Sequence, residues 1–113
     1  MRALVSGVAA AMALALAGPV FAQPQDQVAH GKQVFQYWCA TCHGAGPGHP
    51  GTDALQAKYH DAQPAVLEDL RDLTPETVRF FVRHGVTVMP FFRKTEISDA
   101  DLDAIGAYLA RTR

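Results

Sequence analysis

The sequence predicts a small all-α protein, and three observations support this fold class. Apolar side chains recur at helical spacing at both ends of the region that follows residue 22. Thr74 and Ser98 stand where each can cap the start of a helix. The segment 44–52 is rich in Gly and Pro and cannot be regular. We therefore expect three main helices, one or two short ones, and connecting loops.

The N-terminal 22 residues have the pattern of a secretory signal peptide. Arg2 supplies a positive charge, residues 3–17 are almost all small and apolar, and small residues precede a cleavage point after Ala22. The apolar run is shorter than the ~20 residues that span a bilayer, and it is rich in Ala. We expect residues 1–22 to be removed during export to the periplasm, with no membrane span in the rest.

The remaining residues, 23–113, suit a single small domain. Without Arg2 they contain nine Lys and Arg against eleven Asp and Glu, a formal charge of −2. This mild acidity argues against nucleic acid as a partner.

A first helix is predicted before residue 39, with Asp26 as its cap. Its apolar residues follow a helical spacing: Val28, Gly31, Val34, Phe35 and Trp38. Gly31 costs a helix about 1 kcal/mol relative to Ala, so we expect another helix to approach closely there.

Further helices follow the irregular segment 44–52. Short helices are predicted near residues 53–59 and 64–70. Thr74 and Pro75 begin the next helix, whose buried face is predicted to hold Val78, Phe81 and Val82, and Gly85 ends it. A loop then covers residues 86–95. Ser98 caps the last helix, which is lined by Leu102, Ile105, Gly106, Tyr108 and Leu109.

The most informative motif is Cys39-Ala40-Thr41-Cys42-His43, because CxxCH is the attachment signature of c-type haem. The two thiols add across the haem vinyl groups, and His43 then faces the iron. A thioredoxin-like pair would need a preceding buried strand, and a structural zinc site would need a second pair of ligands. Neither is visible in the sequence. We therefore expect one covalent haem c, held by Cys39 and Cys42.

Met89 is the expected second axial ligand of the iron. It is the only methionine after residue 22, and it lies in a Val-Met-Pro loop, whereas a buried filler would be expected on a helix face. A thioether suits iron, and a His/Met pair raises the reduction potential. The alternative is a second histidine among His30, His49, His60 and His84, with His49 or His60 favoured.

Other residues are expected to complete the haem site. We expect the Pro50 carbonyl to orient the ring of His43, with loop punctuation as the alternative, and Arg71 to reach a haem carboxylate, with an ordinary surface position as the alternative. The pocket walls are expected from Phe35, Trp38, Leu55, Tyr59, Leu67, Leu70, Leu73, Val78, Phe81, Val82, Phe91 and Phe92.

Taken in order, these motifs resemble class I cytochromes c across residues 23–113. They are CATCHG, a preceding helix with Gly31 and Phe35, the Val-Met-Pro loop, and a last helix that ends Ile-Gly-Ala-Tyr-Leu. In that family the terminal helices cross at a contact between a glycine and aromatic residues, which Gly31, Phe35 and Tyr108 match here. The resemblance implies an all-α cytochrome fold around one haem, and an electron carrier that does no bond chemistry of its own.

More narrowly, Met-Pro-Phe-Phe followed by Arg-Lys and a Ser-Asp-capped helix is similar to the small cytochrome subunits of flavoprotein dehydrogenases of the 4-cresol dehydrogenase (p-cresol methylhydroxylase) type. This resemblance implies a flavoprotein that oxidises alkylphenols as the electron donor. Around the exposed haem edge, we expect a docking surface that combines the small residues Ala40, Thr41 and Ala45 with Pro90, Phe91 and Phe92, and with Arg93 and Lys94 at the rim. The alternative is that both phenylalanines are buried and the two cations are solvated on a loop.

Three alternatives stay open at the level of sequence, and one of them is an interaction module without haem that is secreted to the periplasm. A freely diffusing periplasmic cytochrome that serves another dehydrogenase or a terminal oxidase would carry most of the same residues. A haem enzyme or gas sensor would differ in having five-coordinate iron, without Met89 bound to it.

Overall fold

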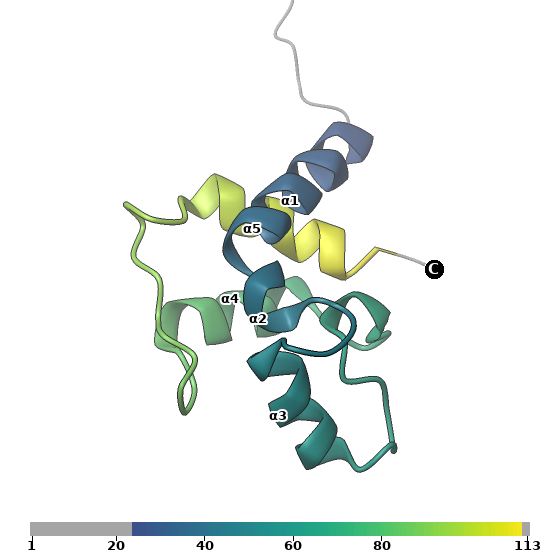
Figure 1. Cartoon of the computed structure of the whole chain (residues 1–113). Helices are drawn as coiled ribbons and strands as arrows, with labels where there is room; N and C mark the ends of the chain where they lie inside the picture. The colour runs from purple at the N-terminus through teal and green to yellow at the C-terminus, as the bar shows by residue number, and fades with distance from the viewer. Residues whose placement is uncertain (1–23, 112–113) are drawn as a thin grey trace, which may run out of the picture.

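The computed structural model describes residues 24–111, so the expected signal peptide lies outside the described residues. Helices make up all the regular structure of the described part, apart from an isolated β-bridge between Val86 and Met89. In chain order (Figure 1) these elements are α1 (Pro24–Trp38), α2 (Ala40–His43), α3 (Pro50–Tyr59), the 3₁₀ turn η1 (Leu67–Asp69), α4 (Pro75–His84) and α5 (Asp99–Leu109). The predicted all-helical fold is confirmed.

The first and last helices cross, as Figure 1 shows, and they form the most extensive helix contact. Gly31 makes the close approach possible: a Cβ atom built on it would lie 1.9 Å from the carbonyl oxygen of Ala104. The rings of Phe35 and Tyr108 pack beside the crossing, with centroids 5.7 Å apart. The expected glycine and aromatic contact is confirmed, and it explains why a residue that weakens helices stands in α1.

The two predicted caps are formed. The hydroxyl of Thr74 accepts a hydrogen bond from the Thr77 amide (3.2 Å), and that of Ser98 accepts one from the Asp101 amide (3.0 Å). Each satisfies one backbone N–H group that the first helical turn leaves without a partner. At the other end of α4, Gly85 adopts φ +70°, a left-handed value that favours glycine.

Three predicted boundaries differ from the structure. Helix α1 begins at Pro24, which places Asp26 in the first turn rather than at the cap. Helix α3 begins at Pro50, three residues early, because proline is well suited to the first helical position. The helix predicted near residues 64–70 is reduced to η1, and Pro64 precedes it in irregular backbone.

The core lies where α4 and α1 meet α5. Its largest fully buried side chains are Phe35, Ile97, Leu102 and Ile105. Helix α3 packs mainly on α2, on the other side of a hollow that separates it from α4. Within residues 24–111, the helices are all too short or too polar to cross a bilayer.

Candidate functional site

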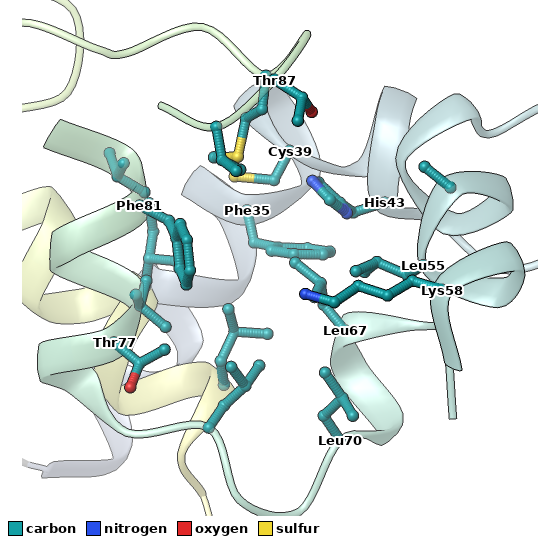
Figure 2. Close-up of a pocket in the computed structure, with 18 of the residues that line it drawn as sticks. Phe35, Cys39, His43, Leu55, Lys58, Leu67, Leu70, Thr77, Phe81 and Thr87 are labelled. Atoms are coloured by element: carbon teal, nitrogen blue, oxygen red, sulfur yellow. The ribbon is translucent and has the colours of Figure 1, made fainter. Parts of the chain in front are cut away.

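A cavity of about 380 Å³ lies between α1, α3, η1, α4 and α5, within the range of sites that bind cofactors. Figure 2 shows side chains from these elements converging on it. Its wall is largely apolar and contains nine of the expected pocket residues: Phe35, Leu55, Tyr59, Leu67, Leu70, Leu73, Val78, Phe81 and Val82. Phe81, expected to be buried, is 39% exposed because it faces this hollow.

The cysteine and histidine motif enters the cavity through α2. The amide of His43 donates to the Cys39 carbonyl (2.8 Å), so these residues are one helical turn apart and lie on the same face. Both line the cavity, whereas Cys42 is exposed and lies outside its lining. Burial, with a smaller contribution from Cys42, raises the pKa of the Cys39 thiol to about 12. The free thiol is therefore protonated at neutral pH.

His43 presents a neutral imidazole to the cavity, because burial lowers its pKa. A neutral ring has the lone pair that a metal requires. Its Nδ1 atom is buried without a hydrogen-bond partner, so the bond expected from the Pro50 carbonyl is not formed; Pro50 occupies the first position of α3. The neighbouring Gly51 is the residue that approaches the ring. A Cβ atom there would lie 2.7 Å from Cε1 of His43.

Met89 reaches the same cavity from the loop that follows α4. Its backbone exchanges two hydrogen bonds with Val86, from the Met89 amide to the Val86 carbonyl (2.9 Å) and in the reverse direction (3.1 Å). The two residues between them form a tight turn in which Thr87 takes φ +50°. Met89 and Val86 both line the cavity, so the hairpin brings the thioether residue to the wall.

The four alternative histidines lie outside the cavity lining. His49 bonds through Nδ1 to the Thr41 carbonyl (2.9 Å), and His84 bonds in the same way to the Phe80 carbonyl (2.8 Å). His30 pairs with Asp101 on the surface (2.7 Å), and His60 is an exposed residue at the end of α3. The described structure therefore offers Met89, and no second histidine, on the cavity wall.

Lys58 is a cavity residue that the sequence reasoning missed. It is the only Lys or Arg among the lining residues, and Figure 2 shows its side chain beside Leu55, directed across the hollow. None of the ion pairs found in the described residues includes it. Its spacing of three residues from Leu55 gives a sequence signal, because positions three apart share a helix face. Arg71, the expected cation, instead lines a separate, smaller hollow with Asp72.

Three aromatic residues expected in the pocket lie elsewhere. Trp38 packs edge to face against Phe92, with centroids 5.8 Å apart, and both lie outside the cavity lining. Phe91 is 60% exposed. The reason is the backbone of Phe92, whose amide donates to the Val82 carbonyl (2.7 Å) and so directs this part of the chain along α4.

The described residues fit a covalent haem: an apolar cavity, a thiol and a neutral imidazole on one helical face, and a thioether on the same wall. Residues 26–109 match the family model for cytochrome C oxidase, cbb3-type, subunit III. Comparison with curated proteins and with solved structures gave no match. The matched region is most of the chain, and this family implies covalent haem c and electron transfer. The chain therefore belongs to the cytochrome c domain family whose description names subunit III of cbb3-type cytochrome C oxidase.

Proposed function

We propose that this protein is a one-electron carrier in which Cys39 and Cys42 hold one haem and His43 and Met89 bind its iron. The observation that carries the proposal is the shared cavity. Cys39, His43 and Met89 all line it, although the Met loop is 46 residues further along the sequence than His43. Apolar packing alone explains Cys39 and Met89 on this wall, but it does not explain the buried imidazole of His43 beside them.

His43 and Met89 would together determine the chemistry of a bound haem. With both residues as ligands of the iron, there would be no place for a substrate to bind it, and the haem would supply one-electron transfer. The thioether raises the reduction potential, and the apolar wall excludes water from the site. A five-coordinate enzyme or sensor is the alternative, and it requires Met89 to be displaced.

Lys58 replaces Arg71 in this proposal as the partner of a haem carboxylate. Lys58 is the only Lys or Arg of the described lining; it is an exposed residue whose ammonium lies 5.9 Å from the centroid of the Tyr59 ring, so it can meet an anionic group of a ligand without first being buried. Haem carries two carboxylates. The flexible four-carbon stem of Lys58 allows the ammonium to meet one of them while its methylenes cover apolar surface.

The core of the proposal is tested by an absorption spectrum and by a measurement of the protein's mass. After acid–acetone extraction, the colour should stay with the protein, and the mass should equal the chain without residues 1–22 plus one haem. The oxidised protein should show the weak long-wavelength band of a thioether–iron bond. Colour in the organic phase would refute covalent attachment, and a high-spin spectrum without the band would favour the five-coordinate alternative.

We further propose that the carrier works in the periplasm and accepts electrons from a flavoprotein dehydrogenase that oxidises alkylphenols. The similarity of the Met-Pro-Phe-Phe segment supports this partner, as does the exposure of Phe91 and of Val88, which is 91% exposed beside Met89. A terminal oxidase is the second candidate for the redox partner, because the description of the matching family names a subunit of a cytochrome C oxidase.

The charged rim of the docking surface is weaker than the sequence suggested. Arg93 pairs with Glu96 (3.3 Å), and Lys94 pairs with Asp99 (2.8 Å). These partners offset much of the field that would steer an approaching protein. Docking should therefore depend more on the apolar residues Val88 and Phe91.

The partner is tested by mixing the oxidised cytochrome with the flavoprotein and an alkylphenol, and by following haem reduction. Val88→Ser/Phe91→Ser should slow reduction more than Arg93→Gln/Lys94→Gln does, with the spectrum unchanged in both. The donor assignment fails if a flavoprotein that is active with another acceptor leaves the haem oxidised.

A further inference from the structure

The loop that presents Met89 makes few contacts of its own. Between α4 and α5, its only internal backbone bonds before residue 92 are the two that join Val86 and Met89. Val88 is 91% exposed and Phe91 60% exposed, so these two side chains do little to fix the hairpin, which contacts the rest of the protein through Met89 and through backbone packed against Gly85. A loop of this kind takes its orientation from the points where it is attached to more rigid elements.

Phe92 is the attachment point on the far side of Met89. Its amide donates to the Val82 carbonyl in α4 (2.7 Å), and its carbonyl accepts from Nη1 of Arg83 (3.0 Å). Both backbone groups of one residue, three positions after Met89, are therefore held by consecutive residues of α4. The aromatic side chain of Phe92 also packs against the core.

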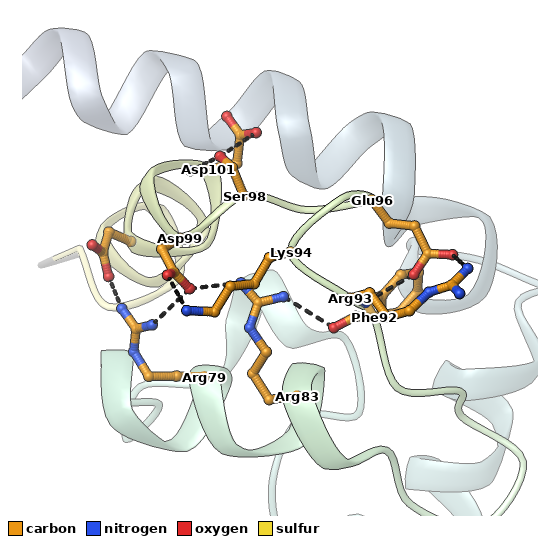
Figure 3. Close-up of polar contacts among 10 residues, drawn as sticks. Arg79, Arg83, Phe92, Arg93, Lys94, Glu96, Ser98, Asp99 and Asp101 are labelled. Carbon is orange, nitrogen blue, oxygen red and sulfur yellow. Dashed lines mark hydrogen bonds and ion pairs between the residues drawn. The ribbon is translucent and has the colours of Figure 1, made fainter.

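Arg83 is itself held in place. Its other terminal nitrogen, Nη2, donates to the Asp99 carboxylate (2.9 Å) at the start of α5, as Figure 3 shows. The Arg83 side chain is only 17% exposed, which limits the screening that weakens surface ion pairs. The planar guanidinium donates in fixed directions from its two terminal nitrogens, here to a carbonyl and a carboxylate.

We infer that Arg83 is a positioning residue for Met89, and that it strengthens the bond from this thioether to the iron by fixing the end of the Met loop. The inference depends on the proposed ligation by Met89. In this inference Arg83 does not contact the cofactor. Arg83 acts through its hydrogen bond to the Phe92 carbonyl, and Asp99 holds Arg83 in place.

Arg79 provides a matched control on the same helix. It is one turn before Arg83 and pairs with Asp103 and, more distantly, with Asp99 (3.7 Å). It has no hydrogen bond to the Met loop among the described contacts. Arg79→Met and Arg83→Met therefore each remove a cation that ties α4 to α5, but only Arg83→Met releases Phe92.

The experiment uses the oxidised haem-loaded protein and imidazole, which competes with Met89 for the iron. Titration with imidazole, followed by loss of the thioether–iron band, should show roughly tenfold tighter binding in Arg83→Met, as expected when a partly buried charge-assisted hydrogen bond is lost. Arg83→Lys, which keeps the charge but loses the fixed fork geometry of the guanidinium, should lie between wild type and Arg83→Met. Arg79→Met should bind imidazole as wild type does.

A second variant keeps the test independent of folding. Asp99→Asn leaves Arg83 and its bond to Phe92 in place but weakens the anchor, so imidazole affinity should rise less than in Arg83→Met. Equal imidazole affinities in wild type and Arg83→Met, or equal increases in Arg79→Met and Arg83→Met, would overturn the role of Arg83 alone. A wild-type protein without the thioether–iron band would overturn ligation by Met89 and, with it, the inference.

Discussion

Gly31 lies so close to Ala104 that no side chain fits between the two helices: a Cβ atom on Gly31 would lie 1.9 Å from the Ala104 carbonyl oxygen and 2.9 Å from Cβ of Tyr108. The first of these atoms belongs to the backbone of a buried helix and cannot rotate away. The position of α1 on α5 is therefore set by the absence of a side chain.

Gly31→Ala should destabilise the haem-loaded protein by about 1–3 kcal/mol or more, because an inserted methyl group forces the two helices apart. Intrinsic helix propensity would favour alanine by about 1 kcal/mol, so the sign of the change identifies the steric cause. Gln33→Ala, at an exposed position of α1, is the control and should change stability by less than about 0.5 kcal/mol. Thermal melts of both variants would decide; a more stable Gly31→Ala would contradict the crossing.

Gly51→Ala should disturb the iron ligand field. The added methyl group would press on the ring of His43, 2.7 Å from its Cε1 atom, and would turn or displace the imidazole. Absorption spectra of the oxidised protein should show an increased high-spin fraction. Gly48→Ala is the control: nothing lies near its Cβ position, and its cost comes from φ +85° alone. Stability should fall in Gly48→Ala without a spectral change, and identical spectra in all three proteins would argue against the His43 contact.

Met89→Ala should abolish the thioether–iron band and lower the reduction potential, because the thioether ligand raises it. No described histidine other than His43 lines the cavity, so water is expected to take the open position and the iron to become largely high-spin. Val88→Ala, at the exposed neighbour, should leave both quantities unchanged. A persisting band in Met89→Ala would assign the ligand to another residue.

Lys58→Met should lower the midpoint potential. A cation near the haem disfavours the more positive ferric state, so its removal stabilises that state. Methionine keeps most of the side-chain length, and Lys58→Arg should restore the wild-type value. Lys32→Met removes the same charge from an exposed position of α1 outside the cavity and is the matched control. Equal potentials in Lys58→Met and wild type would contradict the pairing of Lys58 with a haem carboxylate.

Local chemistry explains what could be predicted from the sequence. The caps at Thr74 and Ser98, the end of α4 at Gly85 and the crossing at Gly31 each depend on one residue and its immediate geometry. The cysteine and histidine motif is equally local, since a single helical turn places Cys39 and His43 on one face.

Side-chain direction in loops could not be predicted in this way. An aromatic residue such as Phe91 is expected in the pocket, but the bonds of the neighbouring Phe92 to α4 leave it exposed. Arg71 follows η1 in irregular backbone, where no periodicity indicates which hollow it faces. Lys58 is accessible to sequence reasoning through its spacing from Leu55, but a lysine on a helix is usually a surface residue, and its place on the cavity wall was therefore missed.

Helices α1 and α5, which pack against each other, are the first and last helices of the described chain. Residues 24–38 make their most extensive helix contact with residues 99–109, and this last helix supplies half of the buried cluster that contains Phe35. Contacts so distant in sequence form only after the intervening residues have closed into a loop. Removal of residues 99–109 would therefore deprive α1 of its most extensive helix contact.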